Sequence, residues 1–143
     1  MVLVTSHLGN WELLAQAVPM FFPVPIGTVF QRLRNPHFDA HVRHIRGRIG
    51  TALFERKEGF NSACELLRAG GAVGVLVDQH AGDAGVWCPL FGRLASTSPL
   101  AVMLALRTNS ALLPIAMHTD GIGRWRMIIE GPVSLGTDRK SVV

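Results

Sequence analysis

Short apolar runs, separated by glycine, proline and polar residues, predict a set of β-strands. We interpret four of these runs as strands, at residues 2–5, 26–30, 72–78 and 111–119. The third run, AVGVLVD, is apolar at nearly every position, which is typical of a parallel strand covered on both faces. After the fourth run, residues 120–123 (DGIG) predict a hairpin turn into a further strand, RWRMIIE.

Apolar residues at helical spacing predict helices between these strands. We expect helices at residues 11–17, from Asn35-Pro36 onward, at about residues 59–69, and from the cap Ser96-Thr97-Ser98-Pro99 to about residue 107. The second helix has one apolar stripe, formed by Phe38, Val42, Ile45 and Ile49. The last is apolar nearly all round, so we expect it to be buried.

Three prolines predict that the first helix stops near residue 17. Pro19, Pro23 and Pro25 lie in an apolar segment and each lacks the backbone N–H that a helix or a central strand needs. The apolar side chains between them, Met20, Phe21 and Phe22, suit either contact with lipid or a turn in the core.

Alternating strands and helices predict an α/β sandwich with a mixed, mostly parallel sheet flanked by helices. At 143 residues the chain is long enough for one domain. Because Met1 opens inside an apparent core strand and the final DRKSVV does not continue the pattern, we expect residues 1–143 to be part of a domain that is incomplete at both ends.

Composition narrows the functional classes. The chain is 48% hydrophobic, 17% charged and has a net charge of +4, which excludes disorder and suits anionic partners such as lipid head groups, nucleic acid or an acidic protein. No nucleic-acid motif and no tyrosine accompany the charge, so we expect no nucleic-acid partner.

Cys64 and Cys88 form no CxxC pair and indicate reduced thiols. No run is long enough to span a membrane, and no signal peptide opens the chain.

The candidate chemistry lies in SHLGNWE, directly after the first strand. His7 and Glu12 are five positions apart, so on one continuous helix they would lie about 140° apart. If Asn10 caps a helix that begins at Trp11, however, a turn lets Glu12 fold back toward His7 at the strand's C-terminal end. A histidine held by a carboxylate is a general base for a hydroxyl. Alternatively, His7 merely ends a strand and Glu12 interacts with a helix dipole.

The local form H-x-G-N-W-E, within H-x4-E, resembles the glycerolipid acyltransferase superfamily and, within it, the bacterial lipid A (lauroyl/myristoyl) acyltransferase family. Further blocks extend the resemblance over most of the chain: Asn35-Pro36 with Asp39 and a downstream arginine, Asp78-Gln79 after an apolar strand, and PLFGR before STSP. One departure is Gln31, which stands where family members often carry arginine.

The resemblance implies transfer of a fatty acyl group from an acyl carrier protein or coenzyme A thioester to a hydroxyl of a lipid A precursor. It implies that His7 is the base, that Glu12 orients it, and that Arg46 with Arg56 binds phosphate or the oxyanion. Asp78 would support the arginine or the acceptor. The remaining residues to which it assigns substrate binding are Asn10, Arg48, Gln79, Phe91 and Gly92. It also implies no cofactor beyond the thioester and a location at the cytoplasmic face of the inner membrane, on an anionic surface.

Three other functions stay open from the sequence. The same motifs occur in acyltransferases that modify phosphatidylinositol mannosides. A metal-dependent hydrolase would use His7, Glu12 and Asp78 as ligands, although no diagnostic ligand spacing is present and we expect no metal. A non-catalytic membrane-binding module would use the basic helix and Phe21-Phe22.

Overall fold

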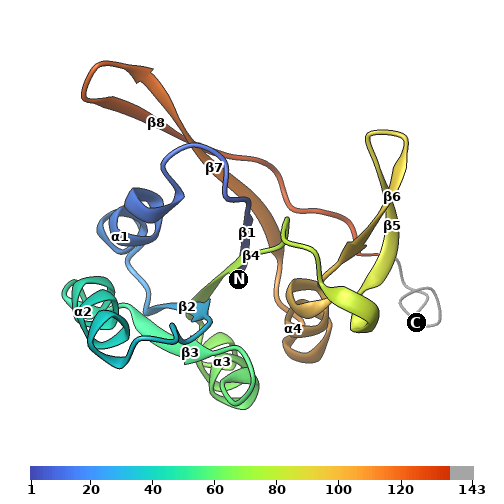
Figure 1. Ribbon diagram of the computed structural model, residues 1–143, viewed down its shortest axis with the longest axis horizontal. Helices are drawn as coiled ribbons and strands as arrows, with labels where there is room; N and C mark the ends of the chain where they lie inside the picture. Colours follow the sequence, from blue (N-terminus) through green and yellow to red (C-terminus); the bar gives the residue numbers. More distant parts are fainter. Residues whose placement is uncertain (136–143) are drawn as a thin grey trace.

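The computed structural model describes residues 1–135 and has a six-stranded sheet at its centre (Figure 1). The strands are β1 (Val2–Thr5), β2 (Ile26–Phe30), β3 (Ala52–Glu55), β4 (Ala72–Leu76), β7 (Leu112–Gly121) and β8 (Arg124–Ile129). Their order across the sheet is β3-β2-β4-β1-β7-β8, and all neighbours are parallel except β7 and β8. The expected mixed, mostly parallel sheet is therefore confirmed.

Helices cover both faces of this sheet. They are α1 (Trp11–Phe21), α2 (Pro36–Gly47), α3 (Phe60–Arg68) and α4 (Leu100–Thr108). Alternation along β1 separates two cores: Val2 packs in a cluster with residues of α3 and α4, and Leu3 packs in a second cluster with Leu14 and Val18 of α1. Both faces of the central strands are thus buried, which explains the continuous apolar runs. In Figure 1, α2 lies beside α1 near the β3 edge.

Helix α1 continues past the position where the prolines predicted its end. Pro19 lies inside the helix, which ends at Phe21, so the prediction of a stop near residue 17 is wrong. Because Pro19 falls in the last turn, the helix loses only one internal hydrogen bond there. Val18, which is 5% exposed, packs against the sheet and its carbonyl accepts a bond from Phe22 N (3.2 Å). Tertiary packing therefore outweighs the local cost of the proline.

Two strand regions differ from the sequence prediction. Strand β3 was not expected, because apolar and polar residues do not alternate clearly along its four positions. It lies at the edge of the sheet, and all four residues are only partly buried. Residues 86–97 form a separate two-stranded hairpin, β5 (Val86–Leu90) and β6 (Arg93–Thr97), preceded by the 3-10 turn η1 (Gly82–Ala84). Ser96 and Thr97 belong to this hairpin rather than to a helix cap. Only Ser98 approaches the start of α4, where its Oγ accepts from Leu100 N at 3.4 Å.

Burial within the helices is less complete than the patterns predicted. In α2, Phe38 of the apolar stripe is 61% exposed, because the helix packs against the edge strand β3 and not over the centre of the sheet. In α4, Leu104 is fully buried but Met103 is 46% exposed.

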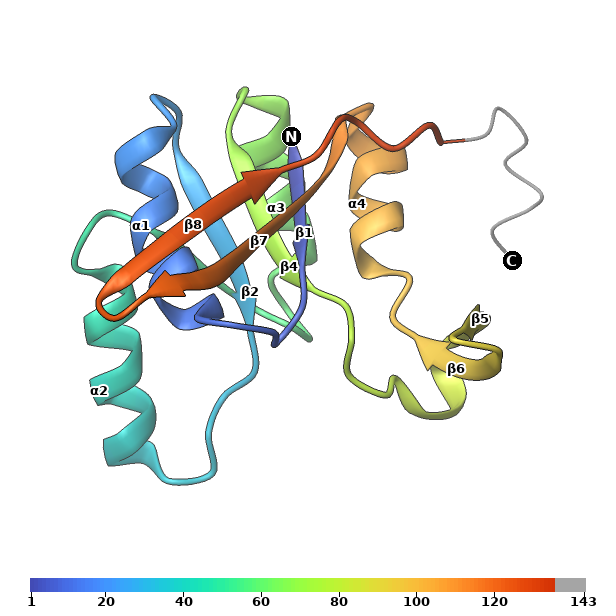
Figure 2. The ribbon, with the colours of Figure 1, turned by 90° about the horizontal axis from the view of Figure 1, so that it is seen from above.

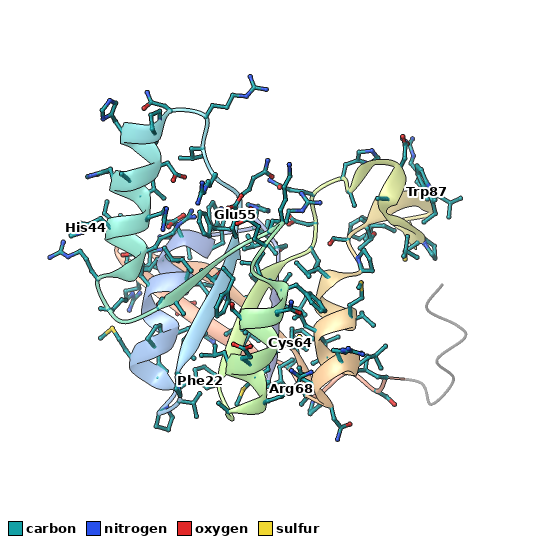
Figure 3. All side chains as sticks on the ribbon, turned by 90° about the horizontal axis from the view of Figure 1, so that it is seen from below. Phe22, His44, Glu55, Cys64, Arg68 and Trp87 are labelled. Atoms are coloured by element: carbon teal, nitrogen blue, oxygen red, sulfur yellow. The ribbon has the colours of Figure 1, made fainter. Side chains whose placement is uncertain are left out.

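Cys64 on α3 (Figure 3) is buried, Cys88 is half-buried, and both thiols are free. No helix within residues 1–135 is both long and apolar enough to cross a bilayer. The segment DRKSVV lies outside the described residues.

Candidate active site

Two of the predicted site residues, His7 and Asp78, meet where the parallel strands end. Thr5 of β1 is paired in register with Leu76 of β4. His7 and Asp78 each lie two residues beyond this pair, so parallel pairing brings them together at one edge of the sheet. This is the edge at which open α/β sheets bind ligands.

His7 is held by Asp78 through two hydrogen bonds. The backbone N–H of His7 donates to Asp78 Oδ2 (2.8 Å), and His7 Nδ1 lies 2.8 Å from Asp78 Oδ1. Partial burial raises the pKa of Asp78, but the hydrogen bonds from the side chain and backbone of His7 outweigh this effect and leave the pKa below its usual value. In a neutral imidazole, donation from Nδ1–H to the ionised Asp78 leaves Nε2 unprotonated, which is the form in which histidine accepts a proton.

Glu12 does not make the expected contact with His7. Its carboxylate accepts two bonds from Arg46, from Nε to Oε1 (2.7 Å) and from Nη2 to Oε2 (2.6 Å). This bidentate hydrogen bonding, together with the charge of Glu12, raises the pKa of Arg46 despite its partial burial. The two acidic residues have therefore exchanged partners relative to the sequence prediction: Asp78 orients the histidine and Glu12 supports the arginine.

Trp11 joins these two pairs. Its ring meets the His7 imidazole edge-on, with centroids 4.9 Å apart, and the Arg46 guanidinium lies 5.8 Å from its ring centre. Helix α1 presents Trp11 and Glu12 in its first turn because Asn10 caps it, with Oδ1 accepting from Leu13 N (3.1 Å). Gly9 lets the turn before α1 lie close to β7. Its φ is +66°, and a Cβ there would collide with the carbonyl of Met117 on β7.

A cavity of about 430 Å³ lies beside His7. This volume is in the usual range for small-molecule sites. The cavity walls carry four arginines and two histidines, together with Trp11, Gln31, Gln79 and Ser98. The six basic or titratable residues are His7, Arg32, Arg34, Arg46, Arg56 and His80. Arg32 forms an ion pair with Glu55 (3.2 Å), which ends β3 and is labelled in Figure 3, whereas Arg34 and Arg56 make no ion pair within residues 1–135. The cavity therefore favours an anionic ligand.

The structure brings together only part of the predicted set. His7, Arg46, Arg56 and Gln79 line the cavity. Glu12, Asp78 and Asn10 act on these residues or on α1, as described above. The other three lie elsewhere: Arg48 is exposed beyond the end of α2, and Phe91 and Gly92 form the turn of the β5–β6 hairpin.

Several cavity residues were not assigned to the site from the sequence. Gln31, Arg32 and Arg34 follow β2, and His80 follows β4, so all four occupy the end of a parallel strand or the loop after it. The rule that selected His7 and Asp78 would have assigned them to the site had it been applied to every strand. Trp11 gave no such signal, since an aromatic residue in a first helical turn is more often a packing residue.

Comparison with known families assigns the chain to one of them. The model of the family described as bacterial lipid A biosynthesis acyltransferase matches residues 1–141 of the 143-residue chain. The chain belongs to this family. It is thus an acyltransferase of the lipid A biosynthesis type. Among curated proteins no match was found.

The contacts in this family member also bear on the metal alternative. Within residues 1–135, no three His, Cys, Asp or Glu side chains gather in a metal-binding arrangement. Of the three ligands that alternative requires, His7 and Asp78 bond to each other, whereas Glu12 is engaged by Arg46. The three groups therefore do not converge on a single point.

Proposed function

We propose that the chain transfers a fatty acyl group from a thioester, carried by acyl carrier protein or coenzyme A, to a hydroxyl of a phosphorylated lipid A precursor. His7 acts as the general base, and Asp78 rather than Glu12 orients it. The observation that carries this proposal is the His7 imidazole, bonded to Asp78 through Nδ1 and set in the wall of a cationic cavity.

The proposed acyl transfer uses Nε2 of His7, the ring nitrogen that does not contact Asp78. His7 Nε2 takes the proton of the acceptor hydroxyl as the oxygen attacks the thioester carbonyl, and Asp78 stabilises the imidazolium that forms. The tetrahedral oxyanion then collapses, the C–S bond breaks, and the proton passes from His7 to the leaving sulfur. The products are an ester and a free thiol.

Arg46 suits stabilisation of the oxyanion. Two of its nitrogens donate to Glu12, and the guanidinium keeps N–H groups beyond those two for a ligand. Glu12 fixes the orientation of these donors before substrate arrives, which is the condition under which such donors are most effective. Arg34 and Arg56, which make no ion pair within the described part of the chain, suit the phosphates of the acceptor.

The test is acyl transfer from acyl carrier protein thioester to a lipid A precursor, with His7→Gln compared with the wild type. We expect turnover to fall by about 10³-fold, in line with the loss of a general base. His44→Gln is the matched control, because His44 is an exposed histidine on α2 (Figure 3). Equal rates for wild type and His7→Gln would refute the mechanism. Product only with a phosphatidylinositol mannoside acceptor would keep the mechanism and change the acceptor.

A further inference from the structure

The β5–β6 hairpin exposes apolar side chains on both of its faces and at its turn. Strand register places Trp87 and Leu94 on one face, and Val86 and Leu90 on the other. The exposed fractions are 57% for Trp87, 68% for Leu94, 53% for Leu90 and 98% for Phe91 at the turn. The only charged side chain between Val86 and Thr97 is Arg93. Figure 3 shows Trp87 on this hairpin, away from the layer of helices.

The turn residue Phe91 is not explained by folding. Phe91 and Gly92 both have positive φ, 49° and 76°, as the two central residues of a type I′ hairpin turn require. Asparagine and glycine are preferred at such positions, and a bulky residue with φ above zero is unusual. Since Phe91 is also almost fully exposed, it gains no packing within residues 1–135 that would offset the strain. Such an outlier points to a function outside the fold.

The base of the hairpin is fixed, so that it projects in a defined direction. Ser96 is 3% exposed, donates from Oγ to the carbonyl of Gly82 (2.6 Å), and accepts from Ala81 N through its own carbonyl (3.0 Å). A two-stranded hairpin without further packing is only marginally stable in water. A partner that covers the apolar tip would stabilise it.

The hairpin adjoins the mouth of the cationic cavity. The chain enters the hairpin from Gln79 and His80 and leaves it toward Ser98 and Leu100, and all four residues line the cavity. The His80 and Trp87 rings meet edge-on at 6.3 Å. Figure 2 shows the hairpin at the same end of the molecule as the C-terminal ends of the parallel strands.

We propose that the tip of the β5–β6 hairpin inserts into the surface of an anionic lipid bilayer and holds the cavity mouth at that surface. A protein partner would cover one face of the hairpin, whereas a bilayer surrounds both apolar faces at once. Arg93 on the hairpin and Arg34 and Arg56 at the cavity match anionic head groups, as basic residues do in interfacial elements.

Insertion is shallow, because the outer edges of a two-stranded hairpin carry unpaired backbone groups that hydrocarbon does not tolerate. Leu90, Phe91 and Leu94 enter the acyl boundary, and Trp87 lies at head-group level, the depth that tryptophan prefers.

The test measures binding of the chain to mixed phosphatidylethanolamine and phosphatidylglycerol vesicles by co-sedimentation. Phe91→Asn suits the turn better than phenylalanine, so it removes the apolar tip without unfolding the hairpin. We expect this variant to bind at least about ten-fold more weakly. The matched control is Ile122→Asn, which removes an equally exposed apolar side chain from the turn between β7 and β8. We expect it to bind like the wild type.

Trp87 supplies an independent readout of insertion. Vesicles should shift the tryptophan emission of the wild type to shorter wavelength, and Trp87→Phe should lose that shift. Neither experiment depends on turnover, so a failure of the proposed acyl transfer would not be mistaken for a failure of membrane docking. Equal binding by Phe91→Asn and wild type, or an emission shift that survives Trp87→Phe, would overturn the proposal. The proposal would also be overturned if Phe91→Asn bound vesicles normally but bound acyl carrier protein more weakly than the wild type.

Discussion

The carboxylates of Asp78 and Glu12 have separate partners in the structure. Asp78 bonds to His7, and Glu12 bonds to Arg46, although H-x4-E predicted that Glu12 would contact His7. The physical reason is register. Parallel pairing of β1 and β4 delivers His7 and Asp78 to the same point, whereas α1 carries Glu12 toward α2.

Asp78→Asn tests the orienting role at this scale. The amide can still accept a bond from Nδ1, but it lacks the charge that stabilises the imidazolium and can turn to donate instead, which favours the wrong tautomer. We expect turnover in the acyl-transfer assay to fall by about 10²- to 10⁴-fold with little change in KM. Asp83→Asn, an exposed aspartate in η1, should leave the rate unchanged. A loss of less than ten-fold in Asp78→Asn would argue that Asp78 only supports the fold.

A double-mutant cycle measures whether Glu12 is coupled to Arg46 or to Asp78. Glu12→Gln and Arg46→Gln remove partners of one pair, so their effects on the free energy of unfolding should be non-additive by about 0.5 kcal/mol or more. Glu12→Gln and Asp78→Asn act on different pairs and should add within about 0.5 kcal/mol. Denaturant titration of the single and double variants gives both terms. Strong coupling between Glu12 and Asp78, with none between Glu12 and Arg46, would contradict this assignment of partners.

Among the secondary-structure elements, α1 shows how one helix positions part of the site. Its first turn supplies Trp11 and Glu12, and its buried side packs Leu14 and Val18 on the sheet. Asn10, to which the family resemblance assigns substrate binding, accepts a hydrogen bond from Leu13 N as the N-cap of this helix. The helix therefore positions two site residues through one cap.

Substitution of Asn10 distinguishes the two roles. Asn10→Ala should lower the free energy of unfolding by about 1 kcal/mol, since it removes the cap. Asn10→Ser should retain most of the stability, because serine is an equally good N-cap. If capping is the whole role of Asn10, the serine variant keeps its activity in the acyl-transfer assay. Wild-type stability with a large loss of activity in Asn10→Ser would instead place Asn10 in substrate binding.

At the scale of the whole molecule, the Asp78–His7 contact ties together segments 71 residues apart in the chain. The pKa of Asp78 is lower in the folded protein than in the unfolded chain, so the unfolded state binds the proton more readily. The stability that this contact contributes is therefore present above the unfolded pKa, near 4, and is lost as the pH falls through the folded value.

Acid titration checks this linkage. The difference in free energy of unfolding between wild type and Asp78→Asn should be constant at neutral pH and should shrink below about pH 4. Chemical denaturation at a series of pH values measures it, with Asp120→Asn as a control for a carboxylate whose ion pair with Arg126 is exposed. A difference that grows on acidification would contradict the assigned direction of the pKa shift.

The local pattern of apolar and polar residues was enough to predict most helices and strands and the positions of His7 and Asp78 at the strand ends. Apolar runs such as AVGVLVD identified the central strands, and Asn35-Pro36 indicated the start of α2. The positions of His7 and Asp78 after apolar runs indicated the sheet edge at which the two residues meet. These features depend on a few neighbouring residues, and the sequence displays them directly. The continuation of α1 through Pro19 was not predictable in this way, because the packing of Val18 against the sheet opposes the local preference.

The sequence by itself determined the α/β class, the edge of the sheet at which the candidate site lies, and a family resemblance that the comparison confirmed. Only the tertiary structure decided which carboxylate serves which partner and which arginines face the cavity. It alone also showed that residues 86–97 stand apart as an apolar hairpin. The reason is that pairing and exposure depend on which strands are neighbours and on their register. Those relations join residues dozens of positions apart, and periodicity within a single segment carries no information about them.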